Sequence, residues 1–584
     1  MKAAIDTETE GLNWRADMPF FVSFYREDGF ALSADLREGE FGALREIVDL
    51  AGRVDRLFFH NAKFDLHALS KVGAYRESWW PKIGDTIVRE YLLDEHRLTY
   101  RLDDVAFDRL GERKIDLSAE TGFSPEYWRM APKADVKRYC ERDAALTLRV
   151  ALDQERELVD QELLGVERLE IEALEAVFAM ERHGVRVDLE RAEAAKRAIH
   201  REMLQSLQAL YSKHGKFWPG SPKEVTRVLQ IRRKQGAWRL PDGSVVPETD
   251  GGAPKLDEAT LRSMPGELPG QILQFKTLEK LSNTFLAKHV ISNAVEGPGG
   301  HYVRANINST KSLSGRGTGT GRLSYDSPAL QQIPSRSESA AAVIKPVFLP
   351  DPGEFWVYGD LDQNEFRVFA HFTYAEKLYE AYRKNPKTDF HGLVAEETGL
   401  PRKASRPGEA NAKQVNLGLI FNMGAGLLAQ TMGLPYTTDE RGNLKPGPEV
   451  LEVLDRYHSA IPGVREINQQ CTRYCEINGF VRTLAGRKIR IPDPEFSYKA
   501  AGLMFQAVAA DNNKRNIALI HRRLKEFGQG RLLINIHDEY SLSLPWSSQA
   551  EDFLRHVCDE IADAGLNIPL SIDFSWGADW HDAL

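Results

Sequence analysis

The segment 355–367, FWVYGDLDQNEFR, limits the possible folds of this chain more than any other stretch. Its apolar and aromatic start predicts a buried strand that ends at a carboxylate, Asp360. A predicted hairpin, formed by 532–536 and 540–544, carries Asp538 at its tip. Three antiparallel strands would bring Asp360 and Asp538 together at one edge of a sheet. We expect divalent metal there, because carboxylate oxygens are ligands that such ions prefer.

The length and composition bound the class of protein. At 584 residues the chain is too long for one hydrophobic core, and the length predicts about three or four domains. It has no apolar run of the ~18 residues that a membrane helix needs, and no signal-peptide pattern at its start. Its 4 cysteines are too few for a disulfide framework. We therefore expect a cytoplasmic protein without a membrane association.

Basic residues are concentrated in one part of the chain. The net charge of -9 and the pI of about 6.0 by themselves argue mildly against a nucleic-acid partner. Between residues 276 and 322, however, bases outnumber acids, and residues 305–322 contain no acid. This run predicts a surface that follows a phosphate backbone, although a solvated basic face fits it about equally well. The bases are Lys276, Lys280, Lys288, Arg304, Lys311, Arg316 and Arg322.

Carboxylates also follow the strands predicted near the N-terminus, where short strands and helices alternate as in an α/β unit. Asp6 and Glu8 lie at i, i+2 of the first strand, so both side chains point to one side and can share a metal pair. A later predicted strand leads to Asp65, and Tyr139 and Asp143 lie at i, i+4 on one helical face. These residues predict a second metal site.

The three motifs at these positions, DTE, HNAKFD and YCERD, resemble those of the DnaQ-like (DEDDy) 3′–5′ exonuclease family. The resemblance implies an RNase H-like domain in which two Mg²⁺ ions neutralise charge on the attacking and leaving oxygens of a phosphodiester. It also implies that Tyr139 orients the attacking water and that Asn61 contacts DNA. The implied metal ligands are Asp6, Glu8, Asp65 and Asp143.

Further motifs resemble family A DNA polymerases, the class of bacterial DNA polymerase I and several phage replicative enzymes. DLDQNEFR and HDE are similar to motifs A and C, AKQVNLGLIFNMG to motif B, and TGRLS to the primer–template segment. The resemblance implies a multidomain α/β and α+β chain with a right-hand polymerase. The implied domains are the exonuclease at 1–160, the thumb at 161–320, the first part of the palm at 321–372, the fingers at 373–479 and the second part of the palm at 480–584.

The resemblance also implies a metal site for nucleotidyl transfer. Asp360 and Asp538, together with the Leu361 carbonyl, would hold two Mg²⁺ ions for in-line attack by the primer 3′-hydroxyl. Glu539 would be an accessory acid beside them. Mn²⁺ is an alternative metal in both sites.

Nucleotide and DNA contacts follow from the same resemblance. Lys413, on the motif B helix, would meet the triphosphate and is a candidate general acid. Glu365 would exclude a ribose 2′-hydroxyl. The spacing of Lys413, Leu417 and Phe421 at i, i+4, i+8 predicts one helical stripe. The implied dNTP-binding residues are Gln363, Glu365, His391, Lys413, Leu417 and Phe421, and the implied DNA-binding residues are Lys311, Arg322, Gln506, His537 and Asn61.

Motif B departs from the family pattern at three places, which affect phosphate binding, the sugar pocket and template handling. An acid stands where the family usually has an arginine, so a nearby base is expected to replace it. The departures are Glu409 for Arg, Leu417 for Phe or Tyr, and Phe421-Asn422 for Tyr-Gly; the candidate replacements for the arginine are Arg402, Lys403 and Arg406.

These motifs predict a monomeric enzyme that extends a primer on a DNA template with dNTPs, releases pyrophosphate and proofreads its product. A phage origin fits the compact architecture and would place the enzyme in the host cytoplasm, with replisome accessory proteins as further partners. Two alternatives remain. A single-subunit RNA polymerase shares the two aspartates and Lys413, but Glu365 and the exonuclease motifs argue against it. A non-catalytic scaffold descended from a polymerase is conceivable because of Glu409.

Overall fold

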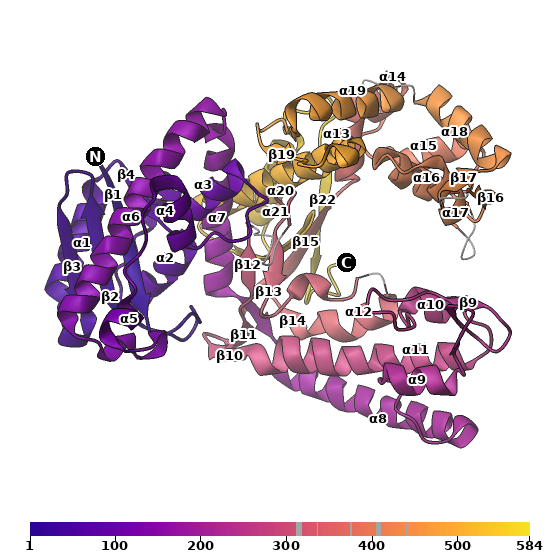
Figure 1. Cartoon of the computed structure of the whole chain (residues 1–584), viewed down its shortest axis with the longest axis horizontal. Helices are drawn as coiled ribbons and strands as arrows, with labels where there is room; N and C mark the ends of the chain where they lie inside the picture. Colours follow the sequence, from indigo (N-terminus) through magenta and orange to yellow (C-terminus); the bar gives the residue numbers. More distant parts are fainter. Residues whose placement is uncertain (311–317, 336, 374–375, 405–409, 440–441, 462) are drawn as a thin grey trace.

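The computed structural model describes the chain from residue 1 to residue 584, apart from 311–317, 336, 374–375, 405–409, 440–441 and 462. Figure 1 shows the N-terminal part as a lobe on the left, and two groups of helices, one above and one below, on the right. Among the described residues, no helix is both long and apolar enough to cross a membrane.

The N-terminal lobe is built on a five-stranded sheet in the order β3-β2-β1-β4-β5, as the predicted α/β alternation requires. Alternate side chains of β1 face opposite layers: Ala3 and Ile5 pack with α1 and α2, and Ala4 packs with Leu148 of α6. The elements are β1 Lys2–Thr9, β2 Pro19–Arg26, β3 Ala31–Asp35, α1 Phe41–Arg53, β4 Arg56–Phe59, α2 Ala62–Lys71, β5 Ile83–Asp85, α3 Thr86–Leu93, α4 Leu102–Leu110, α5 Leu117–Thr121 and α6 Lys133–Asp160.

The lower group of helices in Figure 1 comprises α8 to α12, in which α8 packs against α11 and its continuation η4. α7 packs instead against α20 (Ala500–Phe527) and β20 (Arg531–Ile536) of the C-terminal part, and β6 pairs with both β11 and β14. The elements are α7 Leu164–His183, β6 Val185–Val187, α8 Leu189–His214, α9 Pro222–Val228, β7 Arg232–Lys234, β8 Ala237–Arg239, β9 Val245–Val246, α10 Glu258–Ser263, α11 Leu268–Glu279, η4 Lys280–Val290, β10 Ala294–Gly297, β11 Gly300–Val303, β12 Asn306–Asn308, β13 Ser324–Asp326, α12 Glu338–Ile344 and β14 Phe348–Leu349.

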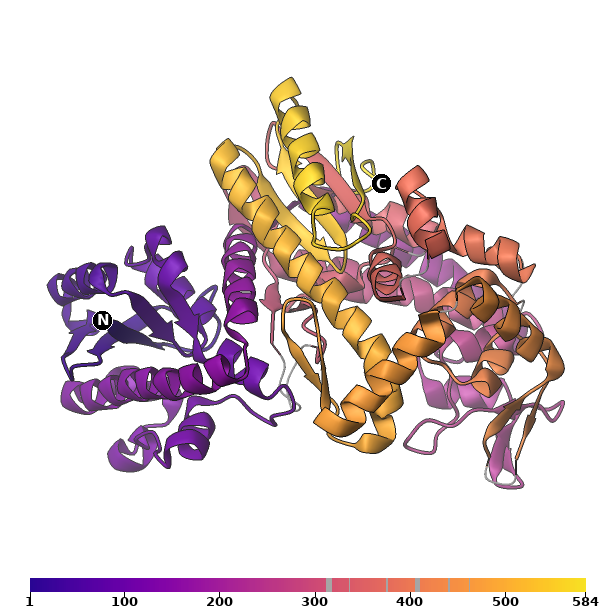
Figure 2. The ribbon, with the colours of Figure 1, turned by 90° about the horizontal axis from the view of Figure 1, so that it is seen from above.

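A four-stranded antiparallel sheet, β20-β21-β15-β22, carries the two acids that the sequence placed at strand ends. β15 pairs with β21 so that Asp360 lies opposite Glu539, and the three-strand arrangement predicted from the sequence is confirmed. Helix α20 crosses this sheet, as Figure 2 shows from above. The elements are β15 Phe355–Leu361, β18 Phe480–Arg482, β19 Lys488–Arg490, α20 Ala500–Phe527, β20 Arg531–Ile536, β21 Glu539–Leu544, α21 Ser548–Ala562 and β22 Ile572–Gly577.

The helices between β15 and β18 pack with the first turns of α20 in a separate hydrophobic core, which includes Phe369, Phe390, Tyr457 and Phe505. The motif B helix α16 ends at Ile420, so Phe421 is its C-cap residue and not part of a third helical turn. The elements are α13 Asn364–Thr373, α14 Glu376–Lys384, α15 Phe390–Thr398, α16 Ala412–Ile420, α17 Ala425–Thr431, β16 Tyr436–Thr438, β17 Leu444–Pro446, α18 Pro448–Ala460 and α19 Gly463–Asn478.

Candidate functional site

Four carboxylates predicted as metal ligands meet beside the sheet of the N-terminal lobe. Asp6 and Glu8 lie on β1, Asp65 on α2 and Asp143 on α6, so three separate elements supply them. The carboxylate oxygens of Asp6 and Glu8 lie within 4.8 Å of each other and of the Cys140 thiol, a neighbour that the sequence reasoning did not identify.

The charges of these carboxylates repel one another in a buried site. Burial, followed by the charge of Asp143, raises the pKa of Asp6 to about 7. Burial and neighbouring carboxylates also raise the pKa of Glu8 and of Asp65 well above the usual range. Among the described residues, the buried atoms Asp6 Oδ2 and Asp143 Oδ1 have no hydrogen-bond partner. Clustered anionic oxygens with free lone pairs fit divalent cations, which would offset the repulsion.

Local contacts hold these ligands in place. The Thr7 hydroxyl and amide donate to Asp65 Oδ1 at 2.7 and 3.2 Å, which ties α2 to β1. Tyr139 lies one helical turn before Asp143, and its hydroxyl hydrogen-bonds that carboxylate. Asn61 is the exposed N-cap residue of α2, with a left-handed φ of 76°. The predicted catalytic tyrosine is therefore next to the carboxylates.

A lysine that carries no sequence signal also enters this site. Lys114, between α4 and α5, has its ammonium nitrogen 2.5 Å from Asp143 Oδ2 and 4.8 Å from the centroid of the Tyr139 ring. Asp103 fixes the loop by accepting from the Lys114 amide at 2.8 Å and from the Arg113 guanidinium at 2.6 Å. Burial opposes protonation of Lys114, but the carboxylate charges outweigh it and raise the pKa of this group. The site thus holds a fixed cation of its own.

Because Lys114 competes with divalent ions for these carboxylates, we expect Lys114→Met to lower the Mg²⁺ concentration for half-maximal 3′–5′ hydrolysis about tenfold, equivalent to ~1.4 kcal/mol of repulsion. The measurement is a Mg²⁺ titration of single-strand degradation at alkaline pH, where the carboxylates are ionised in both proteins. Lys137→Met is the matched control, since its ammonium pairs with Glu141 at 3.8 Å on the surface of α6 and makes no contact with the Lys114 loop. An unchanged or higher Mg²⁺ requirement for the Lys114 variant would contradict this role.

A second carboxylate group lies on the four-stranded sheet. Asp360 lies near the end of β15, and Asp538 lies in the turn between β20 and β21, next to Glu539. The Leu361 amide donates to the Asp538 carbonyl oxygen at 3.1 Å, which joins the strand end to the turn. Burial, then the charges of Asp538 and Glu539, raises the pKa of Asp360 to about 7. This crowding of carboxylates again fits divalent cations.

Two buried amides that the sequence reasoning missed hold the turn. Asn513 of α20 and Asn535 of β20 donate to each other's side-chain oxygens at 2.8 and 3.0 Å. Asn535 also donates to the carbonyl oxygens of His537 and Glu539, at 3.3 and 3.0 Å. Since His537 has a left-handed φ of 57°, these bonds stabilise the unusual backbone that presents Asp538.

A cavity of about 510 Å³ lies beside these carboxylates, and Asn513 lines it. The predicted residues on its wall are Arg322, Gln363, Glu365, Lys413, Leu417, His537 and Asp538. The other described residues predicted for this site are outside the wall: Asp360, Leu361, Glu539, His391, Phe421 and Gln506. Lys311, Arg316, Arg406 and Glu409 lie outside the described residues.

Two predicted contacts of the cavity are already paired. Arg322 forms an ion pair with Glu365, whose pKa is nevertheless raised because burial outweighs the guanidinium charge. Gln363 accepts from the Phe390 amide at 3.1 Å, which joins the start of α13 to the start of α15. Arg322, predicted to contact the DNA, and Glu365, predicted to contact the nucleotide sugar, therefore contact each other.

His391 is buried and lies within range of the Lys413 charge. Burial lowers the pKa of His391 to about 4, so the ring is neutral at physiological pH. The Asn416 amide donates to its Nδ1 at 2.9 Å, which leaves the ring proton on Nε2. Arg402 pairs with Asp389, and its charge contributes to the lowered pKa of His391. One candidate replacement for the motif B arginine is therefore close to the predicted phosphate contacts.

The Phe421-Asn422 departure has a structural explanation. Asn422 has a left-handed φ of 52°, and the amides of Asn422 and Met423 bond back to the carbonyls of Leu419 and Gly418. This is a Schellman ending, in which Asn tolerates the conformation that glycine usually supplies. Phe421 packs on Gly502 of α20, where a β-carbon would lie 3.0 Å from its ring. Gln506 follows Gly502 by one turn.

The two sites and the fold define a class of protein: a nucleotidyltransferase with paired carboxylates on an antiparallel sheet, joined to a nuclease lobe with a second carboxylate group. The chain matches the model of DNA polymerase family A over residues 189–582 and a 3′–5′ exonuclease model over residues 2–158. The chain belongs to DNA polymerase family A, and is a DNA-directed DNA polymerase with an N-terminal 3′–5′ exonuclease domain. Both kinds of domain generally depend on divalent metal.

Similar proteins cover the whole chain. It is 38% identical to the DNA polymerase DpoZ of Salmonella phage PMBT28, over 100% of this chain and 97% of that protein. It is also 38% identical to the DpoZ of Acinetobacter phage SH-Ab 15497, over 98% and 95%. A solved complex of the POL domain of Pol1 from M. smegmatis with DNA primer-template and dNTP has the same fold, with a TM-score of 0.80, 22% identity and coverage of 100% and 95%.

Proposed function

We propose that primer–template DNA and a dNTP meet at the 510 Å³ cavity, with Asp360, Asp538 and the Leu361 carbonyl holding two Mg²⁺ ions and Glu539 beside them. The convergence of Arg322, Glu365, Lys413 and Asp538 on this one cavity carries the proposal. When bound, such ions lower the pKa of the attacking hydroxyl and neutralise the triphosphate. The solved Pol1 complex, which contains DNA and dNTP, supports the same assignment.

The chain's own side chains then bind and orient the substrates. Lys413 binds the triphosphate and can donate a proton to the leaving pyrophosphate, and His391 donates from Nε2. Arg322, Gln506 and His537 contact the DNA, and the minor-groove acceptors present at every base pair suit Arg322 and Gln506. Gln363, Leu417 and Phe421 complete the nucleotide pocket, and Lys311 follows the DNA backbone.

In the exonuclease, we propose that Asp6, Glu8, Asp65 and Asp143 hold a further two Mg²⁺ ions, that Tyr139 orients the attacking water and that Asn61 contacts the strand. The raised pKa of Asp6 and the unpartnered buried carboxylate oxygens support this. Mn²⁺ would serve in both sites.

The domain boundaries predicted above, a monomeric state and action in the host cytoplasm of a phage are parts of the same proposal. The similarity to phage polymerases over almost their full length supports the phage origin. Replisome accessory proteins are further candidate partners.

Glu365 tests the assignment of the cavity. Glu365→Ala should raise the incorporation of rNTPs relative to dNTPs by about 10²-fold, because the carboxylate that fills the space beneath the sugar is removed. Single-nucleotide extension of a labelled primer with each dNTP and rNTP measures the ratio. Glu354→Ala is the control, because Glu354 is bound to Ser543 away from the cavity. An unchanged ratio would place the nucleotide sugar elsewhere.

A further inference from the structure

A residue of the exonuclease domain holds the backbone next to Arg322. The Tyr91 hydroxyl, on α3, donates to the Thr318 carbonyl at 3.0 Å and accepts from the Gly321 amide at 3.2 Å. The Thr318 hydroxyl donates to the Arg322 carbonyl at 2.9 Å and closes the turn. Tyr91 is only 2% exposed, so water cannot replace these bonds readily. One hydroxyl thus binds both sides of the turn that ends at Arg322.

The opposite side of this turn rests on a buried ion-pair cluster. Gly321 has a φ of +82°, and a β-carbon there would lie 3.1 Å from the guanidinium carbon of Arg487. Arg487 donates from Nε to Asp511 at 2.8 Å and forms an ion pair with Glu170. Because Asp511 and Glu170 both hold the Arg487 guanidinium, it cannot move away from the turn. The turn is held between Tyr91 and Arg487.

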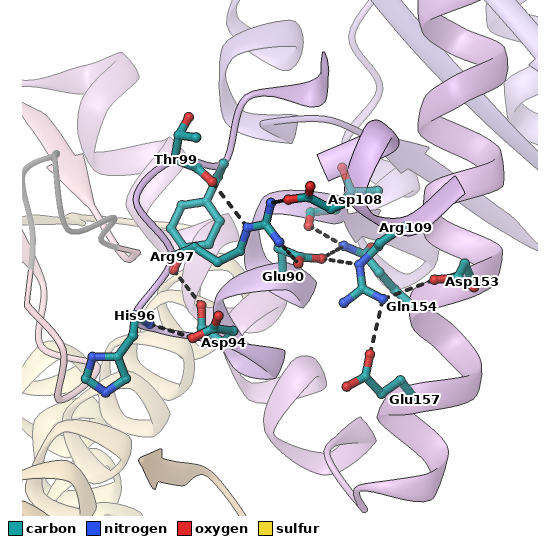
Figure 3. Close-up of polar contacts among 12 residues, drawn as sticks. Glu90, Asp94, His96, Arg97, Thr99, Asp108, Arg109, Asp153, Gln154 and Glu157 are labelled. Carbon is teal, nitrogen blue, oxygen red and sulfur yellow. Dashed lines mark hydrogen bonds and ion pairs between the residues drawn. The ribbon is translucent and has the colours of Figure 1, made fainter. Parts of the chain in front are cut away.

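Helix α3 is itself fixed to the exonuclease domain. Figure 3 shows Arg97, Arg109 and Gln154 converging on Glu90, which is buried on the helix next to Tyr91. Arg97 donates to Glu90 at 3.1 Å, and the Gln154 amide also donates to Glu90, at 2.8 Å. At the other end of α3, Asp85 accepts from the amides of Ile87 and of Ala62, the first residue of α2. The helix that carries Tyr91 is thus tied to the helix that carries the metal ligand Asp65.

The segment after α3 is docked on the polymerase domain. Glu95 forms an ion pair with Arg490 of β19 at 2.6 Å. His96 contacts the Arg490 carbonyl at 2.9 Å, and in Figure 3 its ring points away from the Glu90 network toward the polymerase helices. The Arg490 guanidinium also donates to the Leu92 carbonyl at 3.2 Å. These contacts leave Tyr91 little freedom relative to the turn.

We propose that Tyr91 is a positioning residue for DNA synthesis: from the exonuclease domain, its hydroxyl fixes the 318–321 turn and thereby positions Arg322 for its contact with the DNA. The inference rests on the proposed role of Arg322. Tyr91→Phe keeps the ring and its packing but leaves the buried Gly321 amide without its acceptor. No other described contact accepts from the Gly321 amide, so the backbone that leads to Arg322 is held less firmly in the variant.

The first test is single-turnover primer extension. For Tyr91→Phe we expect the maximal rate to fall about tenfold, as for one buried hydrogen bond of ~1.4 kcal/mol, while single-strand degradation by the exonuclease is unchanged. Tyr100→Phe is the matched control: its hydroxyl donates to the Asp94 carbonyl and its ring packs on Tyr91, but it does not reach the turn. Equal losses in the two variants would overturn the proposal.

A double-mutant cycle separates this inference from the proposed role of Arg322. If Tyr91 acts through Arg322, Tyr91→Phe should cause no further loss in an Arg322→Ala background. Additive losses would overturn the inference. Full extension by Arg322→Ala alone would instead overturn the proposed role of Arg322, on which the inference rests. Hydrogen exchange of the Gly321 amide gives a readout without catalysis, since it should become faster in Tyr91→Phe and stay unchanged in Tyr100→Phe.

Discussion

Asp360→Asn is expected to abolish DNA synthesis, with a fall in the single-turnover extension rate of about 10³-fold or more. The amide keeps the shape of the side chain but has no charge with which to hold a divalent ion. The fold should not suffer. Since burial and neighbouring carboxylates raise the pKa of Asp360, its ionised form opposes folding, and the neutral amide relieves that repulsion. Thermal unfolding with EDTA should therefore give a midpoint no lower than that of the wild type.

The measurement is extension of a labelled primer with Mg²⁺ and dNTPs, with degradation of a single strand assayed on the same preparation. Asp573→Asn is the matched control. Asp573 lies directly opposite Asp360 on β22, and its carboxylate pairs with Lys387, so the same chemical change one strand away should leave extension intact. Residual extension near the wild-type rate in the Asp360 variant would mean that the chemistry occurs elsewhere.

The double variant Asp6→Ala/Glu8→Ala is expected to lower 3′–5′ hydrolysis by about 10⁴-fold, because two of the four clustered carboxylates are removed from one strand. Primer extension from a paired terminus should continue, since the polymerase carboxylates lie on a different sheet. A primer with a mismatched 3′ end should persist in the variant and be trimmed by the wild type. The assay follows a 5′-labelled single strand and a mismatched primer in parallel.

Glu10→Ala is the control for the exonuclease. Glu10 follows β1 directly, and its carboxylate pairs with Arg129. Hydrolysis should therefore survive its removal. If degradation persisted in Asp6→Ala/Glu8→Ala, or if Glu10→Ala abolished it equally, the β1 carboxylates would not be the metal ligands. The reciprocal losses in the Asp360 and Asp6/Glu8 variants would also show that the two activities use separate sites.

Sequence patterns predicted the elements that carry the acids. A buried apolar strand ending in Asp360 and a hairpin with Asp538 at its tip are local features, because alternation and turn residues act over a few positions. The i, i+2 spacing of Asp6 and Glu8 also predicted their shared side correctly. The helical stripe through Phe421 was wrong at its last position. There the left-handed backbone of Asn422 ends the helix early, and this conformation is held by bonds from the Asn422 and Met423 amides to carbonyls three and five positions earlier.

Other parts of the sites could not be predicted, since nothing local marks them. Lys114 is one of two adjacent bases in a loop, and it reaches Asp143 because Asp103 holds that loop. Asn513 and Asn535 are ordinary polar residues until α20 packs on β20 and places their amides together. Such contacts join positions distant in sequence, and a pattern of neighbouring residues carries no information about them.

The sequence by itself determined which acids end which strands and the family, and it predicted two metal sites. Only the tertiary structure decided which residues of the exonuclease domain contact the polymerase domain. Tyr91 has no motif, and it matters because Arg490 and the Glu90 network set α3 against the turn before Arg322. The physical reason is range: strand and helix periodicity acts within one element, whereas the position of one domain on another is the sum of many buried contacts between distant segments.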